Sequence, residues 1–395
     1  MDGRGRRVAV TGLGVVAPCG IGAEAYWQGL LGPGITSGRS VSIDEWDPSP
    51  WYDSPKESRR ADRFEQFATA AAAEAFEQAG GVEAIGVDPA RFGTIYATGV
   101  GGLHSLEDQI LVRLDRGDRR VSPFLVPMMM ANSAGAAISM KYGLQGPNET
   151  VCTACAAGTH AIGNAARQIA WGRCDAVVTG GSESAATLTS IAAFSNMTAI
   201  SSTGISRPFD VDRDGFVMGE GGAVLILEEW DHAVGRGATI LAEIVGAGSN
   251  ADAHHITAPS PGGAGATVCM KLALDDAGLA PEDIRQINAH GTSTPLNDAA
   301  EAEAVRKVFG EAGPPVTSGK GVTGHALGAA GALEAASVIL SMQKRLIPPT
   351  ANTTSVDLGI DVVFGEPREW EPGPTMSSNF GFGGHNGTVI ISPPS

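Results

Sequence analysis

A plan of alternating strands and helices that runs through the chain twice constrains the fold more than any other feature. In the first part, residues 7–16 read as a strand that runs into a glycine turn, residues 63–80 as a helix and 92–99 as a strand. From about residue 239 a strand again precedes Gly-Ala-Gly, and a helix (263–277), a strand (284–288) and a helix of small residues (327–340) follow. Such alternation indicates an α/β protein. Because the same order of strands and helices begins again near residue 239, we predict two similar halves, residues 1–238 and 239–395.

The segment Thr-Ala-Cys-Ala-Ala-Gly-Thr-His, residues 153–160, is the candidate catalytic element of the first half. A short extended run precedes it, and apolar residues at helical spacing follow it. Cys155 is therefore expected on a strand-to-helix turn, where free N–H groups and the helix dipole stabilise a thiolate. Small neighbours leave room for a substrate beside the sulfur. The alternative is a buried structural cysteine, which is the common fate of a free cysteine.

Length and composition exclude several other classes. The chain has 395 residues, of which 43% are hydrophobic, enough for one large core or for two similar domains packed as one body. No apolar run approaches the ~20 residues that a membrane span needs, and the N-terminus lacks a signal peptide, so we expect a cytoplasmic protein without a membrane partner. The net charge of −16 argues against a nucleic-acid partner.

Three weaker motifs are discounted. Cys152 and Cys155 form a C-x-x-C, but no second pair completes a zinc site, and the odd number of five cysteines does not suggest disulfides. The fingerprint Gly12-x-Gly14-x-x-Ala17 lacks the helix and the acidic residue of a dinucleotide site. The acidic run from Asp210 to Asp214 resembles a calcium loop without its last glutamate. We therefore expect no metal and no bound cofactor.

Residues 123–142 contain three consecutive methionines followed by small residues, and they are expected to form a buried helix and its approach. A basic cluster in this acidic protein, Lys56 to Arg63, lies just before the helix at 63–80. Such a cluster is usually a solvated surface, but here it is also a candidate docking patch.

Three polar stretches of the second half share one pattern, in which a functional side chain follows a strand in a glycine-rich setting. They are Asn-Ala-His290-Gly-Thr292-Ser-Thr294, Lys320-Gly-Val-Thr-Gly-His325 and Phe380-Gly-Phe382-Gly-Gly, with Glu301 on the helix after the first. Each histidine taken alone is more often structural. Combined with a cysteine at a helix start, the set indicates nucleophilic catalysis.

This set resembles the β-ketoacyl-acyl-carrier-protein synthases, the elongating condensing enzymes of the thiolase superfamily. The resemblance runs nearly end to end, from Val-Thr-Gly-Leu-Gly through Ser-Arg-Pro-Phe-Asp and Asp-Gly-Phe-Val-Met-Gly-Glu-Gly to Gly-Phe-Gly-Gly. It implies a thiolase-like αβαβα five-layer fold of two pseudo-equivalent halves that works as a dimer. The partner subunit is then a second copy or a chain-length-factor-like subunit.

The resemblance also implies the role of each residue. Cys155 takes the acyl group, and the backbone N–H groups of Cys155 and Phe382 form the oxyanion hole. Decarboxylation of a malonyl thioester leaves an enolate, which N–H groups of two imidazoles stabilise before the new C–C bond forms. By the same resemblance these are His290 and His325; Lys320 holds His325 and adds positive potential, and Glu301 supports the set.

The substrates implied by the resemblance are carried on the phosphopantetheine of an acyl-carrier protein. Thr292 and Thr294 would bind this arm. Phe382 would gate the acyl pocket, and Val100 and Phe380 would contribute to its lining. An acidic carrier needs a basic rim to dock on, and the candidates by position are Arg59, Arg60, Arg119, Arg120 and Arg207.

Departures from the family pattern leave the pathway open. Cys152 replaces a common apolar residue, Gly321 follows Lys320 where serine is common, and the loop 200–206 is short. Fatty-acid elongation and discrete (type II) polyketide or polyene elongation both remain open. The rival from another class is the non-catalytic chain-length factor, which lacks the nucleophile. A thiolase would need a second catalytic cysteine near the C-terminus, but the last cysteine is Cys269. Hydrolysis of acyl groups is expected only as a side activity.

Overall fold

A sheet of 11 strands runs through the protein, whose computed structural model describes residues 5–395. Five strands of the first half follow the order β4-β3-β5-β6-β1, and five strands of the second half follow the matching order β9-β8-β12-β13-β7. The pairing directions also match, because β3 and β8 each have two parallel neighbours, while the two remaining pairs of each half, nearer the centre of the sheet, are antiparallel. The first strands of the halves, β1 and β7, pair with each other at Ala9–Glu243 and Val10–Ala242.

The elements of the two halves have the following bounds. The first half contains β1 (Val8–Ala17), β2 (Gly20–Ile21), α1 (Ala23–Leu30), α2 (Pro55–Ser58), α3 (Arg63–Gln78), α4 (Val82–Ile85), β3 (Phe92–Ala97), α5 (Leu103–Arg116), α6 (Leu125–Met129), α7 (Ser133–Tyr142), β4 (Asn148–Val151), α8 (Ala157–Ala170), β5 (Ala176–Glu183), α9 (Leu188–Asn196), β6 (Gly221–Glu229) and α10 (Trp230–Gly235). The second contains β7 (Ala242–Ala251), α11 (Ala264–Ala277), β8 (Gln286–Asn288), α12 (Pro295–Phe309), β9 (Val316–Thr317), α13 (Lys320–Thr323), α14 (Ala330–Lys344), β10 (Leu346–Ile347), β11 (Arg368–Glu369), β12 (Thr375–Gly381) and β13 (His385–Ser392).

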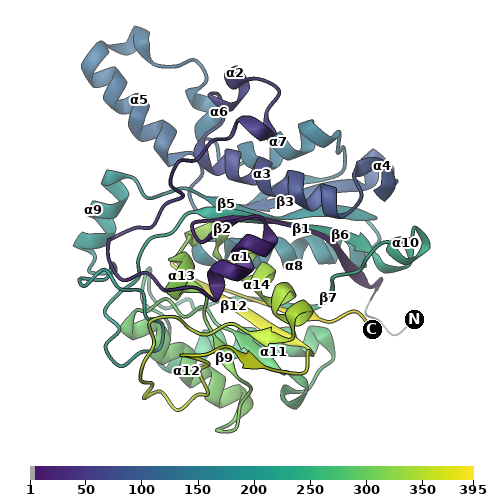
Figure 1. The fold of residues 1–395 in the computed structure, drawn as a ribbon, viewed down its shortest axis with the longest axis vertical. Helices are drawn as coiled ribbons and strands as arrows, with labels where there is room; N and C mark the ends of the chain where they lie inside the picture. The colour runs from purple at the N-terminus through teal and green to yellow at the C-terminus, as the bar shows by residue number, and fades with distance from the viewer. Residues whose placement is uncertain (1–4) are drawn as a thin grey trace.

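The helices form three layers around the two parts of the sheet. Helices α3 and α7 cover the outer face of the first part, and α11 and α12 cover the outer face of the second part (Figure 1). Helices α8 and α14 lie between the parts and contact each other as well as strands of both halves. The predicted five-layer αβαβα fold of two equivalent halves is confirmed. Because α8 and α14 meet at the centre, the turns that open them face one another.

The glycine pairs of the first strands have a packing role that the sequence did not reveal. The predicted glycine turns are wrong, because β1 continues through Gly12 and Gly14, and β7 continues through Gly246 and Gly248. A Cβ atom at Gly14 would lie 1.9 Å from the carbonyl oxygen of Ala71 in α3, and one at Gly248 would lie 2.3 Å from that of Cys269 in α11. Each half therefore uses Gly-x-Gly to bring its first strand against its outer helix.

The segment 123–142 differs from the prediction of a buried helix. It contains two helices, α6 and α7, and only Ala134, Gly135 and Ile138 of α7 are buried. Met129, Met130 and Met140 are exposed, so these methionines do not fill the core of this chain. Within residues 5–395, we find no helix with the length and apolar content of a membrane span.

Candidate active site

Cys155 lies at the start of the central helix of the first half, as the sequence predicts. A short 3-10 turn, Ala154–Ala156, leads directly into α8, and Ala154 adopts a positive φ of 51°. The Cβ of a side chain at Gly381 would lie 3.0 Å from the backbone nitrogen of Cys155, so the end of β12 passes directly against this turn. This contact brings Phe382, the next residue, to the sulfur, where its backbone N–H acts to lower the pKa of the Cys155 thiol.

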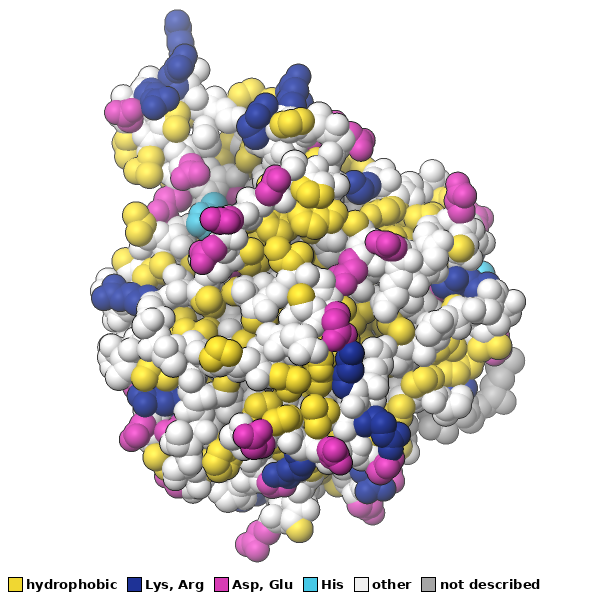
Figure 2. All heavy atoms as spheres, viewed as in Figure 1, with side chains coloured by type: hydrophobic (Ala, Val, Ile, Leu, Met, Phe, Trp, Pro, Cys, Tyr) yellow, Lys and Arg dark blue, Asp and Glu magenta, His cyan; other side chains and the backbone are white. Residues whose placement is uncertain are grey.

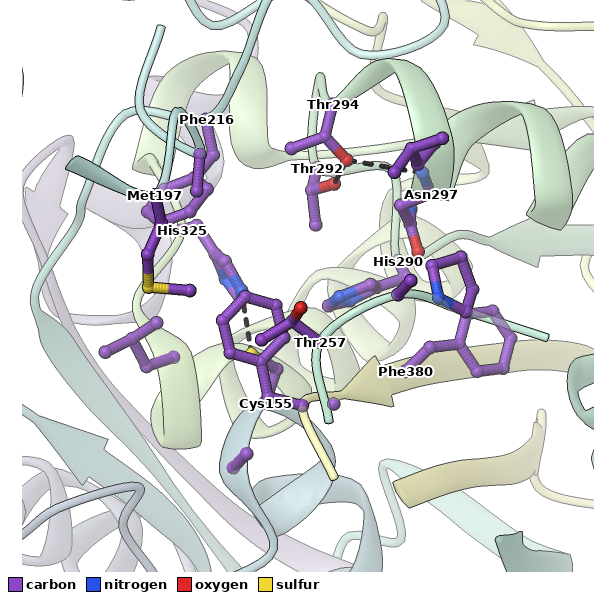
Figure 3. Close-up of a pocket in the computed structure, with 18 of the residues that line it drawn as sticks. Cys155, Met197, Phe216, Thr257, His290, Thr292, Thr294, Asn297, His325 and Phe380 are labelled. Atoms are coloured by element: carbon purple, nitrogen blue, oxygen red, sulfur yellow. Dashed lines mark hydrogen bonds between the residues drawn. The ribbon is translucent and has the colours of Figure 1, made fainter. Parts of the chain in front are cut away.

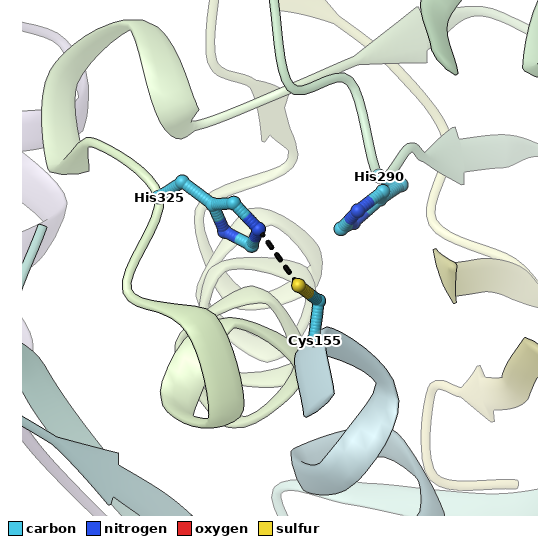
Figure 4. A group of neighbouring side chains, drawn as sticks. All are labelled: Cys155, His290 and His325. Atoms are coloured by element: carbon cyan, nitrogen blue, oxygen red, sulfur yellow. Dashed lines mark hydrogen bonds between the residues drawn. The ribbon is translucent and has the colours of Figure 1, made fainter. Parts of the chain in front are cut away.

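Both predicted histidines reach the same sulfur from the second half of the chain. Nε2 of His325 lies 3.1 Å from Sγ of Cys155, and the centroids of the two imidazole rings are 5.2 Å apart. One ligand atom from each of the three residues lies within 4.8 Å of the others, and all three side chains are buried (Figure 4). The turn before α14 supplies His325, and the loop after β8 supplies His290.

His290 is held in one tautomer by two donors. Its Nδ1 accepts hydrogen bonds from Nδ2 of Asn379 at 3.0 Å and from Nζ of Lys320 at 3.4 Å. The hydroxyl of Thr159 donates to Oδ1 of Asn379, which settles the orientation of the amide. Because Nδ1 is an acceptor, the proton of the neutral ring is on Nε2. Burial and the charge of Lys320 keep the pKa of His290 well below its ordinary value, so the ring is neutral.

Lys320 contacts a different histidine from the one expected. The prediction that Lys320 holds His325 is wrong, because Nζ donates to the carbonyl oxygen of His290 at 2.5 Å and forms a buried ion pair with Glu334. The reason is the short helix α13, whose first residue is Lys320: its side chain points back to the loop after β8, while the chain continues to His325. The predicted positive potential is present: besides burial, the charge of Lys320 lowers the pKa of His325, and at Cys155 it opposes the larger effect of burial, which raises the pKa.

Glu301 supports the backbone around His290 and does not line the cavity. Its carboxyl oxygens accept the backbone N–H groups of His290 at 2.7 Å and of Gly291 at 2.8 Å. Burial raises the pKa of Glu301 to about 8. Glu301 is therefore a positioning residue that shapes the loop after β8, and it makes no direct contact with the reacting atoms.

The three reacting groups open into a cavity of about 540 Å³. The residues predicted to contact the substrate line it: Val100, Thr292, Thr294, Phe380 and Phe382. The hydroxyls of Thr292 and Thr294 lie 2.9 Å apart on one wall, and Phe216 and Met197 form part of the opposite wall (Figure 3). A cavity of this size, with polar groups on one wall and apolar groups on the other, suits a flexible thioester substrate.

The resting state of Cys155 differs from the predicted thiolate. Burial raises the pKa of Cys155 to about 11, although the charge of Lys320 and the backbone N–H groups of Phe382 and Cys155 act in the opposite direction. At neutral pH the sulfur is therefore a thiol. Burial also holds the pKa of His325 well below its ordinary value, so this ring is neutral. Neutral His325 is the acceptor for the S–H proton, and the nucleophile forms only when that proton moves.

The same three side chains have the residue types of a zinc site. Among residues 5–395 they are the one group of this kind whose ligand atoms lie within 4.8 Å of one another. However, the hydrogen bonds from Asn379 and Lys320 leave a proton on Nε2 of His290, so this nitrogen has no lone pair for a metal ion. The absence of a resident metal remains a prediction from the sequence.

The candidate docking arginines are not all equivalent. Arg59, Arg60, Arg119 and Arg120 are exposed, and the guanidinium of Arg60 lies 3.9 Å from the ring centroid of Phe124. Lys and Arg side chains project at the end of the molecule where α2, α5 and α6 lie (Figure 2). Arg207 does not fit this patch, because its side chain is only 17% exposed and is held by Asp214 at 3.7 Å.

The chain belongs to the beta-ketoacyl synthase family. The model of the family's N-terminal domain matches residues 34–233, and the model of its C-terminal domain matches residues 241–354. The 3-oxoacyl-[acyl-carrier-protein] synthase 2 of Coxiella burnetii is 42% identical over 98% of this chain and 98% of its own length.

Solved structures agree with this assignment. The ishigamide ketosynthase/chain length factor is 32% identical, with a TM-score of 0.92 over 99% of this chain and 100% of its own. A second similar structure is a type II PKS acyl-carrier protein in complex with its ketosynthase bound to the hexaketide. Its matching chain is 30% identical, with a TM-score of 0.89 over 99% of this chain and 100% of its own. The protein is thus an acyltransferase of the ketosynthase class with a thiolase-like fold. The alternative of a non-catalytic partner subunit is not favoured.

Sequence reasoning missed the residues that position the reacting groups. Asn379 directly precedes the Phe-Gly-Phe-Gly-Gly motif, and this position beside the motif is the feature of the sequence that could have indicated its role at the site. Glu334 stands in a helix of small apolar residues, where a lone glutamate signals a buried partner. Phe216 packs edge-to-face on His325 with centroids 5.4 Å apart, and it lies in the Asp-Gly-Phe-Val-Met motif that the sequence analysis noted.

The raised pKa of Cys155 predicts how its alkylation depends on pH. The rate constant for iodoacetamide at Cys155 should rise roughly tenfold per pH unit from neutral pH upward, because the thiolate fraction grows in that proportion below the pKa. Peptide mapping by mass spectrometry separates Cys155 from the exposed Cys152. A rate that is already constant with pH at neutral pH would show a resting thiolate and contradict the assignment.

Proposed function

We propose that Cys155 accepts an acyl group from an acyl-carrier thioester, and that the acyl-enzyme then condenses with malonyl-acyl-carrier protein to give a β-ketoacyl-acyl-carrier protein. The observation that carries this proposal is the approach of His325 Nε2 to within 3.1 Å of the sulfur, with His290 in the same cavity. The family membership and the relatives named for this reaction support it.

In the first half-reaction the proton of the Cys155 thiol moves to Nε2 of His325 as the sulfur attacks the thioester carbonyl. The backbone N–H groups of Cys155 and Phe382 stabilise the tetrahedral oxyanion, at on the order of 2.7–4 kcal/mol per donor. Collapse of this intermediate returns the proton from His325 to the departing carrier thiol. The acyl group is then bonded to Cys155, and His325 is neutral again.

In the second half-reaction a malonyl thioester loses CO2, and the negative charge of the enolate develops on the thioester oxygen. His290 is the fixed donor for this oxygen, because Asn379 and Lys320 keep its proton on Nε2. Nδ1 of His325 is buried and has no hydrogen-bond partner among residues 5–395, so no contact at Nδ1 fixes the tautomer of His325. Only the contact of Nε2 with the Cys155 thiol places the ring proton on Nδ1 in the resting enzyme. His325 can therefore accept the thiol proton at Nε2 in the first half-reaction. It donates from Nε2 in the second half-reaction after its ring proton has moved from Nδ1 to Nε2 by exchange with solvent. The carbanion attacks the acyl-Cys155 carbonyl and forms the C–C bond, and the bond between this carbonyl carbon and the sulfur of Cys155 breaks. The released thiolate takes up a proton from solvent, so that Cys155 is again a thiol and the β-ketoacyl chain remains on the carrier.

The proposal includes the carrier and a partner subunit. Thr292 and Thr294 bind the phosphopantetheine arm, and no cofactor is bound by the protein itself.

Strand β4 is at the edge of the sheet and pairs only with β3 among the described residues. Leu111, Leu114 and Met140 are exposed on α5 and α7. These features support a dimer with a second copy or with a chain-length-factor-like subunit. We further propose that the protein acts in the cytoplasm. The boundary between its two halves is proposed to lie after residue 238.

The direct test is the intact mass of the protein after incubation with an acyl-acyl-carrier protein. The expected result is one acyl adduct, which is lost in Cys155→Ala and retained in the matched variant Cys152→Ala. His290→Ala should keep the adduct but should not form the β-ketoacyl product with malonyl-acyl-carrier protein. An adduct that persists in Cys155→Ala would refute the proposal. The preferred acyl length separates fatty-acid elongation from polyketide elongation.

A second prediction concerns carrier docking. Arg59→Glu combined with Arg60→Glu should raise the KM for the acyl-carrier protein by about tenfold, because reversing exposed charges weakens association with an acidic partner. The turnover of an acyl pantetheine without the carrier protein should not change. The matched control is Arg173→Glu, which lies near Trp171 at the end of α8. Equal effects of the two charge reversals on the KM would remove this patch from the proposal.

A further inference from the structure

Glu183 is a buried carboxylate that the reaction described above does not use. It ends β5 with no solvent exposure, and among residues 5–395 no lysine or arginine forms an ion pair with it. A buried carboxylate without a cation is costly unless hydrogen-bond donors surround it. Donors do surround Glu183, and they come from two turns that are far apart in the sequence.

The two oxygens of Glu183 connect the turn after β3 to the turn before α14. Oε2 accepts the backbone N–H of Gly99 at 2.5 Å and the backbone N–H of Gly328 at 3.1 Å, and Oε1 accepts the hydroxyl of Thr98 at 3.0 Å. The first turn belongs to the first half of the chain and the second turn to the second half. One carboxylate thus joins the halves beside the nucleophile.

Each of these turns carries a residue of the cavity wall. Val100 follows Gly99, and Leu327 precedes Gly328 in the turn that begins after His325; both Val100 and Leu327 line the cavity. Leu327 adopts a positive φ of 42°, a strained conformation that neighbouring contacts must maintain. The hydrogen bond from Gly328 to Glu183 is the contact next to this strained residue.

The two turns touch with no room for a side chain between them. A Cβ atom at Gly328 would lie 2.0 Å from the backbone nitrogen of Gly99 and 2.9 Å from Oε2 of Glu183. Since both N–H groups converge on one oxygen, loss of that oxygen leaves two buried donors without an acceptor. The turns would then separate to reach other partners, and Val100 and Leu327 would move with them.

We propose that Glu183 is a positioning residue that sets the width of the acyl pocket between Val100 and Leu327, and thereby the acyl chains that Cys155 accepts. The inference rests on the proposed acyl transfer to Cys155. It assigns to Glu183 no contact with substrate and no proton transfer. The selectivity arises because a wall built from two joined turns fits one range of chains better than another.

The test compares the acylation of Cys155 in wild type and Glu183→Gln. Acyl-carrier thioesters from butyryl to palmitoyl are each incubated with the protein, and the rate of adduct formation is followed by intact mass. In Glu183→Gln an NH2 group replaces one of the two carboxyl oxygens. Either this group faces the N–H donors of Gly99 and Gly328, or the single remaining oxygen faces them and Thr98 loses its acceptor, and the turns then separate. The ratio of the acylation rates for the longest and shortest accepted chains should differ from that of wild type by at least about fivefold. A change of this size is within the discrimination between substrates that contacts in a hydrophobic pocket provide.

A matched control separates selectivity from general loss of stability. The carboxylate of Glu74 also accepts two backbone N–H groups, from Val15 at 2.8 Å and Ala23 at 2.7 Å, but it joins β1 to α1 outside the cavity. Glu74→Gln should leave the chain-length ratio as in wild type. If Glu183→Gln does not fold, Thr98→Val removes one donor with little change in shape and should itself change the chain-length ratio from that of wild type.

The outcomes distinguish this inference from the proposed function. If wild type forms no adduct at Cys155 with any chain, the proposed acyl transfer fails. If wild type forms the adduct and the chain-length ratio of Glu183→Gln, or of Thr98→Val in its place, equals that of wild type, the role of Glu183 is refuted. An equal change of the ratio in Glu74→Gln would also refute it.

Discussion

The buried ammonium group of Lys320 is the interaction on which the site depends. It pairs with Glu334 inside the protein and donates to both Nδ1 and the carbonyl oxygen of His290. Removing one partner of such a pair leaves an unpaired buried charge, which costs about 3–5 kcal/mol. The pair therefore holds the loop after β8 against α14. Asn379 completes the network, since its amide bonds both Glu334 and His290. The result is a neutral imidazole whose only N–H faces the cavity.

The duplicated fold explains why the nucleophile and the histidines come from different halves. Helices α8 and α14 occupy equivalent places and meet at the centre, so the turn with Cys155 lies opposite the turn that follows His325. Each half alone has an incomplete site. The contacts between these turns are tight: the end of β12 passes against Cys155, and Glu183 joins the turns at Gly99 and Gly328. Small residues at these places are required by close approach of the backbones.

The sequence predicted the fold and the reacting residues but not the contacts that position them. Cys155, His290 and His325 stand in motifs whose order matches one family, and the strand-helix alternation is visible in the hydrophobic pattern. The contact of Lys320 with His325 that the resemblance implies is wrong, because α13 turns the side chain of Lys320 toward His290, and no local pattern gives this direction. The thiolate at Cys155 was expected from the helix start alone, whereas burial, which local sequence does not reveal, governs its pKa. Asn379, Glu334 and Glu183 act through long-range contacts that no local pattern contains.

The most direct test of this account is the protonation state of His290. Nitrogen-15 NMR of the imidazole groups, with the signals assigned by comparison with His290→Gln, reports both the charge of the ring and the nitrogen that carries the proton. The account predicts a neutral His290 with its proton on Nε2 at neutral pH. A protonated imidazolium, or a neutral ring with its proton on Nδ1, would contradict the role of Asn379 and Lys320 and remove the fixed donor from the mechanism.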